Sequence, residues 1–134
     1  MIKIATTSVY VSDQRKAHAF YTDVLGFETR MNFPVGDAFW ITVGAVGAQL
    51  DVSLLLEPGD SEIAKTYTSA LHAAGIPAIV FSVDDVHAEY ERLTGLGVTF
   101  TQEPTAQGPV ITAILDDTVG NLLQLAQMVE HPAM

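Results

Sequence analysis

The chain has 134 residues, of which 49% are hydrophobic and 16% are charged, and its formal net charge is −10. This composition predicts one folded domain rather than a disordered chain, and the acidic charge argues against nucleic acid or an anionic membrane as a partner. The absence of cysteine excludes disulfides, thiolate nucleophiles and thiolate metal sites, and it favours a cytosolic setting.

The first predicted unit is a strand, a capped helix, a glycine stop and a second strand over residues 9–30. Asp13 can accept hydrogen bonds from the first turn of the helix, and Gly26 can take the left-handed conformation at its end. Strands are predicted next at 38–43 and 49–56, and a bridging helix within 60–75.

The same pattern returns 71 positions later, where Asp84 corresponds to Asp13 as the predicted cap and Gly97 corresponds to Gly26. A cap and a glycine stop that recur at one offset indicate two copies of one supersecondary unit. The remaining strands of the second copy are predicted at 98–102, 110–115 and 122–127, with a loop over 103–108. Each unit is therefore β-α-β-β-β: the first covers about 4–58, the bridge 59–76 and the second about 77–128.

Two such units predict an α+β fold in which each sheet has one face under its own helix and one bare face, and the bare faces form a cup. Because side chains alternate along a strand, the more polar alternate residues are expected in the cup. On the predicted strands these are Thr6, Ser8, Tyr10, Gln49, Asp51, Ser53, Ser82 and Gln124. The apolar alternates are expected under the helices: Val9, Val11, Leu50, Val52, Leu54, Leu56, Ile79, Phe81, Val83, Leu123 and Leu125.

The stretch VYVSDQRKAHAFYTDVLGF resembles the opening motif of the vicinal oxygen chelate superfamily, which includes glyoxalase I, bleomycin-resistance proteins and extradiol dioxygenases. DDTVGNLLQLAQ is similar to its closing motif, although the proline and second aspartate usual within residues 117–121 are missing. The resemblance spans roughly residues 4–128. It implies paired β-α-β-β-β modules, a cupped open barrel, and frequently a dimer that completes the cleft.

In enzymes of this superfamily the cup holds a divalent metal, and the resemblance places the corresponding positions at Thr6, Ser53, Ala78 and Gln124. None of these is an imidazole or a carboxylate, and Ala78 has no donor, so we expect no family-type metal centre and no cofactor. The four histidines, which are expected on the surface, lie on the helices, in the bridge and in the tail: His18, His72, His87 and His131.

The aromatic residues of the first unit favour a small-molecule pocket, although core packing or a dimer interface explains them equally well. Either Phe39 or Trp40 faces the cup. An inward Asp51 would pair with a ligand cation or act as a base, or it lies in water at the rim.

The leading prediction is a metal-independent protein that binds a cationic or aromatic small molecule, as in bleomycin-resistance-type sequestration, with a homodimer expected and no catalytic residue assigned. The expected contacts are Tyr10, Phe33, Trp40, Asp51, Ser53 and Gln124. Two alternatives remain: a glyoxalase-like lyase, isomerase or dioxygenase with a rearranged metal site, and a dimeric interaction module.

Overall fold

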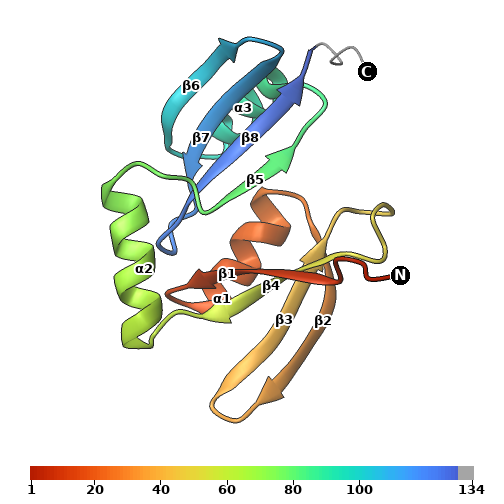
Figure 1. The fold of residues 1–134 in the computed structure, drawn as a ribbon, viewed down its shortest axis with the longest axis vertical. Helices are drawn as coiled ribbons and strands as arrows, with labels where there is room; N and C mark the ends of the chain where they lie inside the picture. Colours follow the sequence, from red (N-terminus) through yellow and green to blue (C-terminus); the bar gives the residue numbers. More distant parts are fainter. Residues whose placement is uncertain (130–134) are drawn as a thin grey trace.

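The computed structural model describes residues 1–129 as two four-stranded sheets with three α-helices (Figure 1). The last five residues, His131 among them, lie outside the described residues. In chain order the elements are β1 (Thr6–Val11), α1 (Gln14–Ala19), the π-helical turn η1 (Phe20–Val24), β2 (Glu28–Val35), β3 (Ala38–Gly44), β4 (Ser53–Pro58), α2 (Glu62–Ala73), β5 (Ile79–Ser82), α3 (Val86–Gly95), β6 (Phe100–Gln107), β7 (Val110–Asp116) and β8 (Leu122–Met128).

The two sheets have the same strand order, β1-β4-β3-β2 and β5-β8-β7-β6. In each sheet the first strand pairs in parallel with the fourth, and the other pairs are antiparallel. α1 packs on β3 and β4, while α3 packs on β6, β7 and β8 and lies behind them in Figure 1. The predicted α+β class with paired β-α-β-β-β units is confirmed, and the sheets are cupped rather than closed into a barrel.

One hydrophobic core lies on the helix side of both sheets and joins the two halves. The predicted apolar alternates Val9, Val11, Leu54, Leu56, Leu123 and Leu125 are buried in it, and Ile79, Phe81 and Val83 pack against it. Tyr21 of η1 is fully buried among them. Because this core uses the helix-covered faces, the opposite faces of the sheets remain bare, as the strand alternation predicts.

The helices of the two halves differ by one residue, and the π-helical turn accounts for it. Asp13 caps α1 by accepting from the Lys16 N–H, but α3 is capped by Asp85 rather than by the predicted Asp84. The cap and the glycine are therefore 13 positions apart in the first half (Asp13 to Gly26) and 12 in the second (Asp85 to Gly97). The bond from the Leu25 N–H to the Phe20 carbonyl spans five residues, so η1 absorbs the extra residue.

Two predicted strand boundaries are wrong. β4 begins at Ser53 instead of residue 49, because Gln49 has a φ of 46° and closes a turn with Val52, a conformation that a strand does not allow. Leu50 is consequently 72% exposed rather than under the helix.

The predicted loop over 103–108 is largely strand, because β6 continues to residue 107. β6 is an edge strand, where the missing N–H of Pro104 is tolerated, and the ladder shifts register between Gln102 and Thr105. Among residues 1–129, no helix is long and apolar enough to cross a membrane.

Candidate ligand-binding site

The bare face of the first sheet carries an aromatic pair, of which Phe33 is exposed and Trp40 is half-buried. The register pairs Phe33 of β2 with Trp40 of β3, and their rings stack with centroids 6.4 Å apart and planes 23° apart. Trp40 therefore faces the cup, while Phe39 faces the helix side, where its backbone binds the Gln14 side chain and Arg15 lies over its ring. Met31 and Phe33 are each 46% exposed, which is a large apolar surface for a face that no helix covers.

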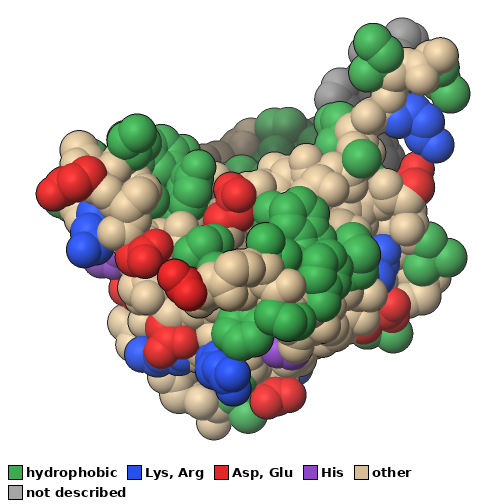
Figure 2. Space-filling model, turned by 90° about the horizontal axis from the view of Figure 1, so that it is seen from below, with side chains coloured by type: hydrophobic (Ala, Val, Ile, Leu, Met, Phe, Trp, Pro, Cys, Tyr) green, Lys and Arg blue, Asp and Glu red, His purple; other side chains and the backbone are tan. Residues whose placement is uncertain are grey.

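The view of the molecule from below shows hydrophobic side chains gathered into a patch near the centre, with acidic and basic side chains scattered around it (Figure 2). The β2–β3 end of the first sheet lies on this side of the molecule (Figure 1). The patch is the kind of surface that binds a ligand or another protein, because isolated chains rarely leave such areas open to water.

Hydroxyl groups line the same bare face. Thr42 lies between Met31 of β2 and Leu55 of β4 in the ladder, and its buried Oγ1 has no hydrogen-bond partner within the described part of the chain. Ser8 pairs with Leu55, and Ser53 pairs with Thr6 two residues earlier along the parallel strands. A buried hydroxyl without a partner is costly, but the Thr42 side chain is fully buried, so Ser8 and Ser53 are the hydroxyls that a molecule on this face can reach.

The bare face of the second sheet is less aromatic. Gln124 of β8 lies between Val80 of β5 and Ile114 of β7, is half-buried, and makes no side-chain hydrogen bond in the described residues. Val80 is 56% exposed beside it. This face therefore offers an amide and aliphatic side chains rather than charge.

Asp51 does not lie on a strand, in contrast to the expectation from alternation. It precedes β4 in the loop 45–52, and its carboxylate is 3.3 Å from the Lys3 ammonium, with the two side chains about 60% exposed. In the described residues, the bare faces carry charged groups toward strand ends: Glu28 is paired with Arg30, Asp116 is paired with His72, and Glu57 lies next to Tyr10 at the end of β4.

The positions that the family uses for metal do not form a metal site in this chain. Thr6 and Ser53 are opposite one another, whereas Ala78 supplies no donor and Gln124 is opposite Val80. No group of three or more His, Cys, Asp or Glu side chains able to hold a metal ion occurs within residues 1–129. The donor set that is present does not fit a divalent first-row metal.

The described histidines lie away from the centres of the bare faces. His18 Nε2 is 2.7 Å from the Thr29 hydroxyl, His72 Nε2 is 3.0 Å from Asp116 Oδ2, and His87 is exposed on α3.

Arg30 fixes the loop at the end of the first bare face. Its guanidinium donates to five carbonyl oxygens of this loop, the two shortest bonds being those to Ala45 at 2.9 Å and Ala48 at 3.0 Å. It lies so close over Gly44 that a Cβ there would be 2.5 Å from the guanidinium carbon. Sequence reasoning did not identify this arginine, because the only signal was a glycine at the end of a predicted strand.

A buried network ties the first half to the turn between β7 and β8. The Tyr21 hydroxyl donates to Asp117 Oδ2 at 2.7 Å, and the Asn121 side-chain amide donates to both Asp117 Oδ2 and the Tyr10 carbonyl. Asp117 Oδ1 accepts the N–H groups of Val119 and Asn121. Burial, followed by the charge of Asp117 and its hydrogen bond, raises the pKa of Tyr21 above its usual range.

The turn itself departs from the family motif, as the sequence predicts. Thr118 has a φ of 66°. A proline cannot adopt this angle, since its ring holds φ near −65°. The backbone at Thr118 therefore has a conformation that a proline at this position would not allow.

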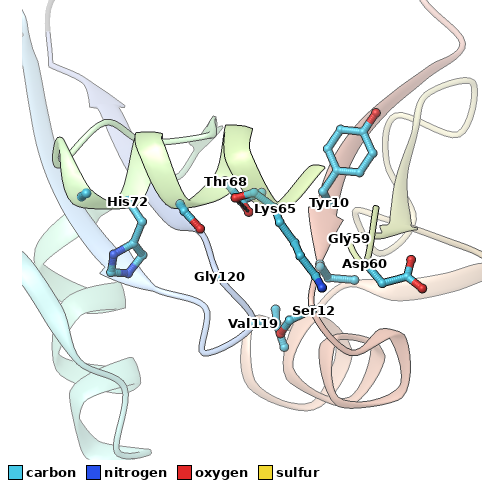
Figure 3. Close-up of a pocket in the computed structure, with 12 residues that line it drawn as sticks. Tyr10, Ser12, Gly59, Asp60, Lys65, Thr68, His72, Val119 and Gly120 are labelled. Atoms are coloured by element: carbon cyan, nitrogen blue, oxygen red, sulfur yellow. Dashed lines mark hydrogen bonds between the residues drawn. The ribbon is translucent and has the colours of Figure 1, made fainter. Parts of the chain in front are cut away.

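A cavity of about 700 Å³ lies between α2 and the β7–β8 turn rather than over the centre of a bare face. Figure 3 shows Lys65 and His72 reaching from α2 toward the side of Ser12 and Gly120, while the Tyr10 ring points the opposite way. Because Tyr10 also lines this cavity, the cavity adjoins the first sheet along β1.

Comparison with known proteins relates this chain to a family and to individual relatives. The model of the Glyoxalase/Bleomycin resistance protein/Dioxygenase superfamily matches residues 3–125. The uncharacterised protein YurT of Bacillus subtilis (strain 168) is 45% identical over 126 residues, which cover 94% of this chain and 99% of YurT.

Two solved structures are similar over nearly their whole length. UcmS2 is 32% identical with a TM-score of 0.81, covering 94% of this chain and 98% of that one. TnmS3, an antibiotic binding protein from Streptomyces sp. CB03234, is 28% identical with a TM-score of 0.74, covering 96% and 97%. Because the family model covers residues 3–125, this chain belongs to the glyoxalase/bleomycin resistance protein/dioxygenase superfamily.

Proposed function

We propose that this protein binds a small, uncharged aromatic molecule on its bare sheet faces without metal or chemistry, and that a second copy of the chain completes the cleft. The observation that carries the proposal is the stacked pair of Phe33, which is exposed, and Trp40, which is half-buried, on a face that no helix covers. Tyr10, Ser53 and Gln124 are the further proposed contacts. A cleft with aromatic walls and a few convergent polar groups is the usual composition of a small-molecule site.

The charge distribution favours an uncharged ligand over a cation. The carboxylate of Asp51, which would have attracted a cation, is 3.3 Å from Lys3 in a loop. Ser8 and Gln124 offer neutral donors and acceptors toward the middle of the bare faces, and the carboxylate of Glu57 lies only at the end of β4. The net charge of −10 then belongs mainly to the outer surface, where it keeps the protein dispersed.

The similarity to TnmS3, an antibiotic binding protein, supports a binding role for this chain. The unfavourable donor set at Thr6, Ser53, Ala78 and Gln124 supports metal-independent binding rather than a glyoxalase-like reaction. We further propose that the whole chain acts as one domain in the cytoplasm, a location that the absence of cysteine favours.

The test uses three probes of one shape and different charge: 2-naphthol, 2-naphthylmethylammonium and 2-naphthoate. Trp40 is the chain's single tryptophan, so its fluorescence reports on the site directly, and calorimetry gives the affinity. We expect 2-naphthol to bind with a Kd of about 100 µM, tighter than either charged probe. Trp40→Ala should abolish binding, whereas Tyr90→Leu on α3 should not change it.

Each contrary result has a definite meaning. Tighter binding of the ammonium probe would favour a cationic ligand over an uncharged one. Binding only after equilibration with nickel, zinc, iron(II) or manganese would favour the metal-dependent enzyme. A dimer that binds none of the probes would favour an interaction module and contradict the proposal.

A further inference from the structure

Helix α2 is incompletely covered on its apolar side. Among its residues only Ala64 is buried, whereas Ile63 is 82% exposed and Tyr67 is 51% exposed. The polar side chains Lys65 and His72 lie on the other flank and line the large cavity of Figure 3. Because a surface helix normally turns its apolar stripe to the core, the exposed flank of Ile63 and Tyr67 is available to another molecule.

That flank faces a separate hollow of about 320 Å³, which we call the α2 niche. Ile63 and Tyr67 of α2 form one wall, Ser8 and Tyr10 of β1 form another, and Ala78 and Asn121 contribute from the second half of the chain. The rings of Tyr10 and Tyr67 meet edge to face, with centroids 6.4 Å apart and planes 78° apart. The niche therefore has an aromatic corner and a volume within the range of small-molecule sites.

The chemistry of the niche suits an uncharged ring. No charged side chain lines it. The amide group of Asn121 is already committed, since it donates to the Tyr10 carbonyl at 2.8 Å and to Asp117 at 2.9 Å. The Ser8 and tyrosine hydroxyls remain to hydrogen-bond a polar substituent of the ring.

The niche shares Tyr10 with the proposed site and Ser8 with the same sheet face. One row of the ladder crosses the whole first sheet from Met31 through Thr42 and Leu55 to Ser8, and Ser8 lines the niche. With neighbouring strands about 4.8 Å apart, this row is roughly 14 Å long. Met31 and Ser8 at its two ends are exposed, whereas Thr42 and Leu55 between them are buried, so an elongated ligand that holds both places has to span about this length above the row.

We infer that the α2 niche is a second subsite of the binding site, taking a further aromatic ring of an elongated, uncharged ligand, with Tyr67 determining specificity for that ring. This inference rests on the proposed function, because the first part of the ligand is held at Phe33 and Trp40. The inference assigns a role to Tyr67 of the bridging helix, a residue that the sequence analysis placed in no site.

The experiment compares 2-naphthol with 6-phenyl-2-naphthol, which carries one more ring in line. We expect the added phenyl group to raise affinity for the wild-type protein about tenfold, because it is buried in the niche. Tyr67→Ala should remove this gain and change 2-naphthol affinity less than twofold. Trp40→Ala should weaken both probes, and Thr66→Ala, an exposed position on the same helix, should weaken neither.

The outcomes separate the two ideas. If Tyr67→Ala leaves the phenyl gain intact, or weakens both probes equally, the niche is not a subsite, while the proposed function stands on 2-naphthol binding. If neither probe binds the wild-type protein, the proposed function fails and the subsite fails with it. If Tyr67→Ala dissociates a dimer, as measured by sedimentation, and the phenyl gain remains, the flank is covered by a second copy and the inference is wrong.

Discussion

The hydroxyl group of Tyr21 joins two segments that are 96 positions apart in the chain. Its acceptor, Asp117, is fully buried and receives four hydrogen bonds, from Tyr21, Val119 and twice from Asn121. A buried carboxylate is tolerated only when its oxygen atoms are satisfied in this way. The side chain of Tyr21 thus supports the turn that carries Asn121, which in turn holds the Tyr10 carbonyl next to the proposed ligand site.

We expect Tyr21→Phe to lower the free energy of unfolding by about 2 kcal/mol at pH 7, because it removes one hydrogen bond to a buried charge. Urea denaturation followed by circular dichroism measures this loss. Tyr90→Phe is the matched control, since the Tyr90 ring packs on Phe100 but its hydroxyl makes no hydrogen bond in the described structure. Equal effects of the two substitutions would show that the Tyr21 hydroxyl contributes nothing specific.

The same pair gives a pH dependence with a definite sign. The pKa of Tyr21 is raised by burial and by Asp117, so above pH about 10 the unfolded chain loses this proton while the folded protein keeps it. The unfolding free energy of the wild-type protein should then fall with pH by up to about 1.4 kcal/mol per unit more steeply than that of Tyr21→Phe. The difference between the two proteins should therefore shrink above pH 10, and a constant difference would contradict the raised pKa.

At the scale of the secondary-structure elements, one guanidinium group holds the loop 45–52 in place. Arg30 donates to five of its carbonyl oxygens and is 3.3 Å from Glu28, and it can do so only because Gly44 leaves room for it. This glycine is required for close approach and not for a left-handed backbone. The loop that bounds the first bare face is thus set by a contact between β2 and β3.

We expect Gly44→Ala to displace Arg30, lower the unfolding free energy by about 2 kcal/mol and speed amide hydrogen exchange across the loop. Gly95→Ala is the matched control, because Gly95 is helical and a Cβ there meets nothing within 4 Å. That control should be neutral or stabilising by up to about 1 kcal/mol. Unchanged exchange in the loop of Gly44→Ala would mean that Arg30 does not hold it.

Element type could be predicted from the sequence where periodicity was strong, and element boundaries could not. Alternation placed Val9 and Leu123 under the helices correctly, and Asp13 was recognised as a cap. The position of Asp51 was wrong, because the turn at Gln49 depends on a left-handed backbone that glutamine rarely takes and that alternation cannot reveal.

The one-residue difference between the halves was missed for a related reason. A fixed offset between repeats assumes that both helices are uniform, so it assigned the second cap to Asp84. The π-helical turn at residues 20–24 breaks that assumption, because it holds an additional residue without moving Gly26 or the strand after it. Sequence spacing alone does not distinguish a shifted cap from a locally widened helix.

At the scale of the whole molecule, the bare faces leave apolar surface on both halves, including Val35 at 52% and Val80 at 56% exposure. We expect the protein to sediment as a dimer, at twice the 14.4 kDa chain mass, with these faces covered. Val80→Lys should shift it toward monomer, because the ammonium group would be buried against apolar surface. Leu96→Lys, at the end of α3 on the helix side, should leave the dimer intact. A wild-type monomer at micromolar concentration would contradict the expectation.

The hydrogen bonds that join Tyr21 and Tyr10 to residues 117–121 have a consequence for folding during translation. The first half can form its own helix and sheet while the ribosome is still translating, but the partners of the Tyr21 hydroxyl and the Tyr10 carbonyl do not exist until the last strand is nearly made. Domains generally fold as units as the chain emerges. In this protein these two contacts of the nascent N-terminal half stay unmade until residues 117–121 of the β7–β8 turn have been synthesised.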